Sequence, residues 1–363
     1  MKKRFLMLCI SFVFTFTALM PISVFADEAQ IETPVPSKLT VMGDSIAAGF
    51  GLEGYSKKDL SKCRSYANIL AEMYTEELKD ECSFELANVA VSGDTSTQLL
   101  EHIQKGQFDD ALKNSDCVII SIGGNDVLEL FLEFLRDNMQ LNKDSKLKDV
   151  VDQVSDLKVV LDGLNDLKDK MDVALEGFEN NLEVLIDEIQ SRTDGVIIFQ
   201  TLYDPLNGYD PAFMFQGISK DKIGKLDEII KEHSVDENGN TRYLVCDIYE
   251  AFYEKGTELT NIKAMDIHPN AAGHELIAQC LDETVRTQTY TYEPKEDEQS
   301  SDEDAAASAA SSDKVADVSG ETVSEDENDD NSDKIRLGIS IAAVALAGGA
   351  VAVLILTREK KKK

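Results

Sequence analysis

The stretch Val41-Met42-Gly43-Asp44-Ser45-Ile46-Ala47-Ala48-Gly49 is the feature around which the predicted fold is organised. An apolar run over 39–42 breaks at Gly-Asp-Ser and continues into small, helix-compatible residues, which predicts a buried strand turning into a helix at Ser45. Ser45 then lies at the carboxyl end of a strand, where open α/β sheets keep their ligand crevice, and near a helix N-terminus, which favours an anion. Both positions suit a nucleophile whose attack creates an oxyanion. Gly-Asp-Ser is also an ordinary turn, and serine is an ordinary N-cap. Other parts of the sequence must therefore decide whether Ser45 is a nucleophile.

Four further apolar runs bounded by turn residues resemble this first strand. They lie at 84–91, 117–122, 195–201 and 242–248. Helical periodicity separates them, most clearly at 65–79 and 270–285. Five short strands alternating with helices predict one parallel sheet with right-handed crossovers.

The connection after the third strand is longer than a crossover needs. Residues 127–192 contain almost no Gly or Pro and are dense in Leu, Val, Asp and Lys, which predicts two or three helices. This helical insertion is either a lid or specificity cap beside the site, or a helical hairpin packed on the sheet edge. The sequence leaves both interpretations open.

The N-terminus has the pattern of a secretory signal peptide. A basic Met1-Lys2-Lys3-Arg4 precedes an apolar run over 5–25, and the small Ala26 precedes acidic residues, so residues 1–26 are expected to be removed. An uncleaved membrane helix is the alternative, and Pro21 near the end of the run disfavours it.

The C-terminus predicts a membrane anchor. Residues 335–357 are apolar except for Arg336 and are long enough to span a bilayer, and the basic tail 358–363 should stay in the cytoplasm. A wall-sorting signal has a similar shape, but the Leu-Pro-x-Thr-Gly motif it needs is missing. Residues 290–334 are rich in Glu, Asp, Ser and Ala, which predicts a disordered acidic spacer acting as a stalk. The globular part of the chain, 27–289, is therefore expected at the extracytoplasmic face of a single-pass membrane protein whose C-terminus is inside.

Charge and cysteine usage exclude several classes of function. The formal net charge of −32 makes nucleic acid and anionic lipid surfaces poor partners. Cys117 and Cys246 lie inside apolar runs and resemble small buried hydrophobes. Cys63 and Cys82 flank the helix predicted at 65–79, whose ends are roughly 20 Å apart, too far for a disulfide. Neither Cys-x-x-Cys nor a Cys/His cluster indicates zinc.

Three later stretches carry groups that complement Ser45. Asn88-Val89-Ala90-Val91-Ser92-Gly93-Asp94 ends the second strand, and Gly93 permits close backbone approach to a ligand. Ser121-Ile122-Gly123-Gly124-Asn125-Asp126 ends the third and offers the Asn125 amide. Met265-Asp266-Ile267-His268-Pro269 precedes the last helix, and His268 is the best general base among the four histidines. Each stretch alone would pass for a turn or helix cap.

Together the four blocks resemble the SGNH hydrolase, or GDSL esterase/lipase, superfamily. Gly43-Asp44-Ser45, Gly93, Gly-x-Asn-Asp at 123–126 and His268-Pro269 occur in the family's order, and the phrases at 45–52 and 91–95 resemble its arylesterase/lysophospholipase-like members. The resemblance covers about 38–287. It implies a flavodoxin-like three-layer α/β/α fold with a five-stranded parallel sheet.

The resemblance also implies a role for each residue. Ser45 attacks an acyl carbonyl, and His268 takes its proton and returns it to the leaving group. The backbone N–H groups of Ser45 and Gly93 and the side-chain amide of Asn125 hold the oxyanion. Neither a metal nor an organic cofactor is implied. The Gly-x-Ser-x-Gly elbow is absent, which disfavours an ordinary α/β-hydrolase.

The catalytic acid departs from the family pattern. The family's acid usually lies three residues before the histidine, where this chain has Met265, whereas Asp266 lies two before it. Either the loop bends so that Asp266 orients His268, or a backbone carbonyl does so in a Ser–His dyad. We expect Asp266 to be the acid.

These residues predict a membrane-anchored serine ester hydrolase. Its substrates are acyl esters of lipids, favoured by the apolar segment 127–135, or O-acetyl groups on sugars and wall polymers, favoured by the stalk. An acyltransferase using the same site and a non-catalytic surface binding module are the alternatives.

Overall fold

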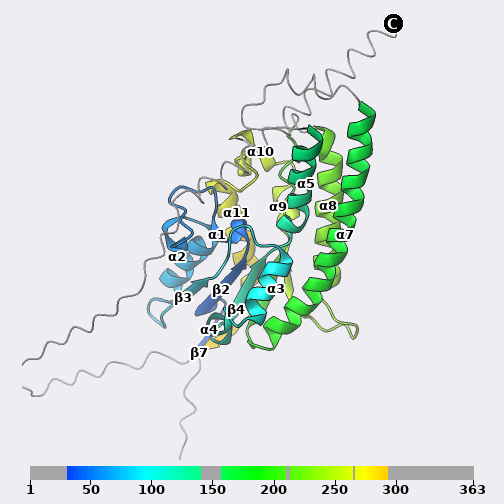
Figure 1. The fold of residues 1–363 in the computed structure, drawn as a ribbon. Helices are drawn as coiled ribbons and strands as arrows, with labels where there is room; N and C mark the ends of the chain where they lie inside the picture. Colours follow the sequence, from blue (N-terminus) through cyan, green and yellow to red (C-terminus); the bar gives the residue numbers. More distant parts are fainter. Residues whose placement is uncertain (1–30, 140–156, 210–212, 265, 293–363) are drawn as a thin grey trace, which may run out of the picture.

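The computed structural model describes residues 31–139, 157–209, 213–264 and 266–292. These residues fold around a central sheet (Figure 1). The predicted signal peptide, membrane helix and basic tail lie outside those residues, as does the spacer beyond 292. Within the described ranges, no helix is both long and apolar enough to cross a membrane.

The five predicted strands form one parallel sheet, as expected. They are β2 (Lys38–Gly43), β3 (Glu85–Asn88), β4 (Cys117–Ser121), β5 (Val196–Gln200) and β6 (Leu244–Cys246). Their order is β3-β2-β4-β5-β6, which is the flavodoxin-like arrangement. Gly43 pairs with Ser121, so the strands β2 and β4 end side by side at the edge where Ser45 follows.

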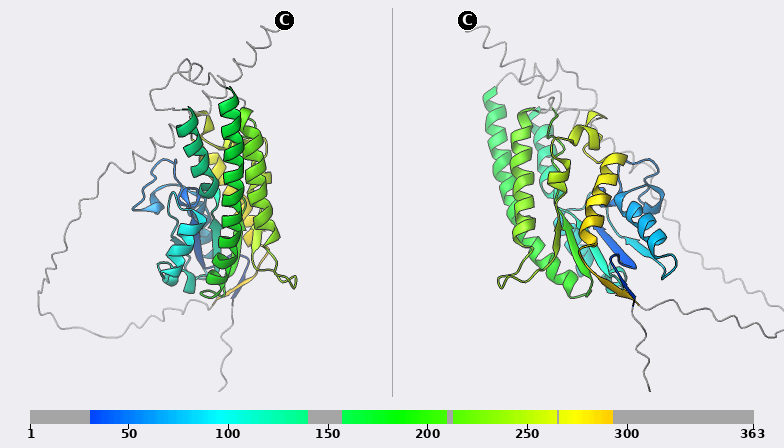
Figure 2. Two further views of the ribbon diagram at one scale, coloured as in Figure 1. Left: turned by 45° about the vertical axis from the view of Figure 1, so that its right-hand side comes forward. Right: turned by 180° about the vertical axis from the view of Figure 1, so that it is seen from behind.

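Helices cover both faces of the sheet, which confirms the three-layer prediction (Figures 1 and 2). The helices are α1 (Ser45–Ala48), α2 (Tyr66–Leu78), α3 (Ser96–Gln104), α4 (Asp109–Lys113), α5 (Gly124–Met139), α7 (Leu157–Gln190), α8 (Phe213–Glu232), α9 (Ile248–Phe252), α10 (Gly256–Leu259) and α11 (Ala271–Val285), with short 3₁₀ turns at Leu60–Lys62 and Ile262–Ala264.

Alternate residues of each strand enter different cores. Val41 and Ile119 pack with α2 and α11 on one face, whereas Met42 and Ile120 pack with α3, α5, α7 and α8 on the other. This alternation follows from the two-residue period of a strand, and the continuous apolar runs follow from burial of both faces.

In its described parts the insertion after β4 is helical and forms α5 and α7, while residues 140–156 lie outside the described ranges. The helices α5, α7 and α8 pack side by side and rise beyond the carboxyl edge of the sheet (Figure 1). Further along α7, Phe178 and Leu182 join the core on the sheet face. Nearer its N-terminus Met171 lines a cavity beside Ser45.

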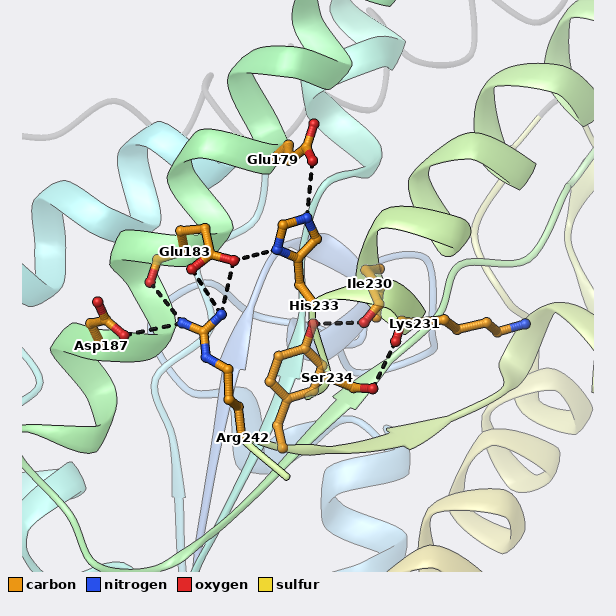
Figure 3. Close-up of polar contacts among 9 residues, drawn as sticks. Glu179, Glu183, Asp187, Ile230, Lys231, His233, Ser234 and Arg242 are labelled. Atoms are coloured by element: carbon orange, nitrogen blue, oxygen red, sulfur yellow. Dashed lines mark hydrogen bonds and ion pairs between the residues drawn. The ribbon is translucent and has the colours of Figure 1, made fainter. Parts of the chain in front are cut away.

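An ionic cluster ties α7 to the segment between α8 and β6 (Figure 3). His233 contacts the carboxylates of both Glu179 and Glu183, the Nε2–Oε1 distance to Glu179 being 3.0 Å. Arg242 donates to both oxygens of Glu183, at 2.9 and 2.8 Å, and to Asp187 at 3.1 Å. Burial alone would lower the pKa of His233, but the two carboxylates raise it.

The two ends of the described chain meet in a small antiparallel ladder that the sequence did not reveal. Strand β1 (Ile31–Thr33) pairs with β7 (Tyr290–Tyr292). Residues 290–292, which the sequence analysis places at the start of the spacer, thus belong to a strand, and Tyr290 is 5% exposed and packs in the core.

Within the described ranges, Cys63, Cys117, Cys246 and Cys280 are free thiols. Cys117 and Cys246 are buried in strands, as the apolar runs predict.

Candidate active site

The turn between β2 and α1 fixes Ser45 at the carboxyl edge of the sheet. Gly43 has φ +137°, and a Cβ there would stand 1.9 Å from the carbonyl oxygen of Ser121. The Asp44 N–H donates to that same oxygen at 3.0 Å. The Asp44 carboxylate then caps α1 by accepting the Ile46 N–H at 2.9 Å. Glycine is thus required for the close approach of β2 to β4 that orients the serine.

Ser45, His268 and Asp266 lie in one hydrogen-bonded chain. The Ser45 Oγ is 2.9 Å from His268 Nε2, and His268 Nδ1 is 2.6 Å from Asp266 Oδ1. With the Nδ1 proton donated to the carboxylate, Nε2 accepts from the serine hydroxyl, which is the tautomer a general base needs. His268 is 5% exposed.

A local turn brings Asp266 to the histidine although only one residue separates them. Asp266 Oδ1 also accepts the backbone N–H of His268, at 3.0 Å. This is the Asx-type bond that an aspartate makes to the backbone two residues on, and it bends the loop. Of the two arrangements that the sequence left open, the structure shows the carboxylate meeting the imidazole.

The surroundings of Asp266 favour its ionised form. Burial would raise its pKa, but the hydrogen bonds and charge of His268 outweigh burial, and the pKa is lowered. A carboxylate that stays ionised can stabilise an imidazolium at His268.

Two residues after α1 support the histidine. Phe50 packs on the His268 ring with a centroid distance of 4.6 Å. Gly51 has φ +88°, and a Cβ there would lie 2.9 Å from Asp266 Oδ2. Both belong to the motif phrase at 45–52, but their contact with the histidine loop crosses more than 200 residues and is not visible in the sequence.

Of the two other predicted oxyanion donors, Gly93 lies on the loop after β3, and Asn125 lies in the first turn of α5. Gly93 has φ +97°, and a Cβ there would meet nothing within 4 Å, so backbone conformation rather than crowding favours glycine. Asn125 Nδ2 donates to the Asp94 carbonyl at 2.8 Å and thereby links the start of α5 to the loop that carries Gly93. An amide nitrogen carries two hydrogens, and Asn125 lines the same cavity as Ser45.

Asp126 joins the first turn of α5 to the first residue of α3. Its carboxylate accepts the Ser96 N–H at 2.9 Å and the Ser96 Oγ–H at 2.5 Å. Asn181 of α7 donates to the same Ser96 Oγ at 2.9 Å, so the insertion also contacts the start of α3, which follows the loop that carries Gly93.

Two other carboxyl groups lie close enough to Asp44, the residue before the nucleophile, to affect its pKa. Burial raises the pKa of Asp44 to about 7, and the neighbouring carboxyl groups of Asp126 and Asp94 act in the same direction. Asp44 is 2% exposed and serves as the helix cap described above.

The remaining histidines stand apart from this chain of contacts. His274 is fully buried, accepts the Tyr66 N–H at 3.2 Å and has its pKa lowered to about 3 by burial, which keeps it neutral. His102 faces Asp94, and His233 belongs to the α7 cluster. The choice of His268 from sequence is therefore the one that the geometry supports.

An apolar cavity of about 120 Å³ opens from Ser45 and His268. Its volume is roughly ten times what one water needs. The loop after β5 and the helices α5, α7 and α8 form its walls. The apolar side chains that line it include Val127, Leu128, Phe131, Leu206, Phe215 and Ile218.

This fold and site define a hydrolase of the SGNH type, in which serine, histidine and aspartate gather at the carboxyl edge of a parallel sheet. The chain belongs to the GDSL-like lipase/acylhydrolase family, a family of ester hydrolases, whose model matches residues 41–276. The resemblance inferred from the four sequence blocks is confirmed.

Individual relatives are distant. An uncharacterized protein of Bacillus subtilis (strain 168), YpmR, is 23% identical over 305 residues, covering 79% of this chain and 98% of that protein. A lipase from a goat rumen metagenome superposes with a TM-score of 0.48 at 16% identity, covering 68% of this chain and 96% of that one. An acetylxylan esterase from Geobacillus stearothermophilus superposes with a TM-score of 0.43 at 21% sequence identity, covering 69% of this chain and 94% of that one.

Proposed function

We propose that the protein is a serine hydrolase that cleaves carboxylic esters through an acyl-enzyme on Ser45. The observation that carries the proposal is the chain from Ser45 Oγ through His268 to Asp266, with distances of 2.9 and 2.6 Å, at the mouth of an apolar cavity. Nucleophile, base and orienting acid are then within reach of one bound carbonyl.

The reaction begins at Ser45. Its Oγ attacks the acyl carbonyl as His268 Nε2 takes the hydroxyl proton, and the imidazolium passes that proton to the departing alcohol. Water then enters, gives a proton to Nε2 and attacks the acyl-enzyme, and Ser45 recovers its proton as the carboxylic acid leaves. Asp266 keeps Nδ1 protonated and stabilises the imidazolium at both steps.

The negative charge that develops on the carbonyl oxygen is held by three donors. We assign them to the backbone N–H groups of Ser45 and Gly93 and to the second N–H of the Asn125 amide. The bond from Asn125 to the Asp94 carbonyl orients that amide before substrate arrives. One such donor typically contributes about 3 kcal/mol to lowering the barrier.

The cavity favours acyl chains of several carbons over acetyl groups. Its walls are apolar, and transfer of a methylene group from water to such a site is favourable by about 0.8 kcal/mol. An acetyl group would leave most of the cavity unfilled. O-acetyl groups of glycans therefore remain the second candidate substrate, and an acyltransferase remains a variant of the same chemistry with an alcohol in place of water.

A panel of p-nitrophenyl esters tests this proposal. We expect kcat/KM for the octanoate to exceed that for the acetate at least tenfold, and Ser45→Ala to hydrolyse neither. A preference for acetate would favour the deacetylase, and product formed only with an added alcohol acceptor would favour the transferase. A folded protein that cleaves no ester would favour the binding module.

The terminal segments support attachment to the outer face of a membrane. We infer a cleaved signal peptide over 1–26, a spacer up to 334, a membrane helix over 335–357 and a cytoplasmic tail. Strand β7, from which the spacer continues, lies at the amino edge of the sheet, opposite the site (Figure 2). The cavity would then face away from the attachment point.

Cell fractionation tests the anchor. The full chain should sediment with membranes and be accessible to external protease, whereas a chain ending at 334 should appear in the medium. A truncated chain that stays with the membrane would contradict the anchor without touching the esterase proposal.

A further inference from the structure

A buried lysine interrupts the apolar wall of the cavity. Lys222 of α8 lines the cavity with Ser219, Ile223 and Met171, yet its side chain is only 3% exposed. A buried ammonium is costly unless it is paired. Here Nζ lies 2.6 Å from Asp172 Oδ1 on α7 and 3.2 Å from Asp221 Oδ2.

The two carboxylates that pair with Lys222 lie at the outer surface of the protein. The side chains of Asp172 and Asp221 are 44% and 50% exposed, so Lys222 reaches from the cavity to the outer surface. Met171 is the residue through which α7 lines the cavity, and Asp172 follows it directly. The four-carbon stem of Lys222 thus separates apolar space from solvent where α7 meets α8, as long charged side chains can do.

We propose that Lys222 closes the acyl pocket and sets the longest acyl chain that the enzyme accepts. The inference rests on the ester hydrolase activity proposed above. A chain that reaches Lys222 cannot advance without displacing the stem and breaking its two ion pairs. For each methylene group that stays outside the pocket, kcat/KM is about fourfold lower than it would be if that group were buried.

Acyl-chain profiles of the full-length protein test this inference. Monomeric p-nitrophenyl esters of even chain length from acetate to palmitate would be compared for the native protein and three variants. Lys222→Ala removes the stem, Lys222→Met keeps a stem of similar length without the charge, and Lys225→Ala removes a lysine that pairs with the same Asp172 at 2.9 Å but does not line the cavity.

We expect native kcat/KM to rise with chain length and then fall sharply. In Lys222→Ala the maximum should move to longer chains by at least two carbons, with a gain of about 15-fold for the first ester beyond the native limit, from about fourfold per methylene. Lys225→Ala should keep the native maximum, whereas Lys222→Met, which keeps a stem but loses the ion pairs that hold it, should move the maximum less than Lys222→Ala does. An unchanged maximum in folded Lys222→Ala would overturn the inference, as would an equal shift in Lys225→Ala.

The native protein provides a second test that needs no folded variant. Labelling of Ser45 by p-nitrophenyl alkylphosphonates should slow abruptly beyond the chain length at which hydrolysis falls. Labelling rates that keep rising to the sixteen-carbon reagent would show that the pocket has no closed end. If no ester and no phosphonate of any length reacts, it is the proposed hydrolase activity that fails.

Discussion

Removing the Asp266 carboxylate tests the unusual position of the catalytic acid. In Asp266→Ala, His268 loses the 2.6 Å bond at Nδ1 and the 3.0 Å bond at its backbone N–H. One charge-assisted bond contributes about 1.5–3 kcal/mol, which corresponds to roughly 10- to 150-fold in rate. Without the carboxylate, the imidazole can also adopt the tautomer that carries its proton on Nε2, and that tautomer cannot accept the Ser45 proton. We therefore expect kcat to fall at least about a hundredfold.

KM should change little, because Asp266 is not among the residues that line the cavity. Steady-state hydrolysis of p-nitrophenyl octanoate measures both constants, and thermal unfolding shows whether the variant folds. Glu258→Gln, which removes an exposed carboxylate from α10, should leave kcat unchanged. A loss below tenfold in folded Asp266→Ala would refute the triad and favour a Ser–His dyad.

Three further changes test other parts of the site and fold. Asn125→Ala should lower kcat by about 10²–10³ with little effect on KM, and a change confined to KM would remove it from the oxyanion hole. In urea unfolding, Gly43→Ala should lose at least about 3 kcal/mol because its Cβ would strike the β4 backbone, whereas Gly217→Ala, whose Cβ meets nothing within 4 Å, should be neutral or slightly stabilising. Burial raises the pKa of Asp227 to about 8 from 3.8, so the native state keeps a proton that the unfolded chain loses, and stability should fall as pH rises from 4 to 8. Asp227→Asn should flatten that fall, and an unchanged slope would contradict the buried acid.

The sheet and the gathering of the site were predictable because they depend on local patterns. Each strand is a short apolar run closed by turn residues, and parallel strands bring their carboxyl ends to one edge. Ser45, Gly93 and Asn125 all follow such ends, so their proximity required only the strand order.

The remaining features depend on packing between distant segments. The bend at Asp266 comes from an Asx bond that two-residue spacing neither requires nor excludes. Phe50 and Gly51 reach the histidine loop only because that loop returns beside α1. The role of Lys222 could not be predicted, because it depends on the side-by-side packing of α7 and α8, and the helix α8 itself carries no motif.

Covalent labelling with a fluorophosphonate is the most direct test of an activated Ser45. The full-length protein and Ser45→Ala would be treated in parallel and analysed by intact mass and peptide mapping. The site described here predicts one adduct, on Ser45, in the native protein and none in the variant. A folded native protein that acquires no adduct, or a variant labelled as fast as the native protein, would contradict the assignment of Ser45 as the nucleophile.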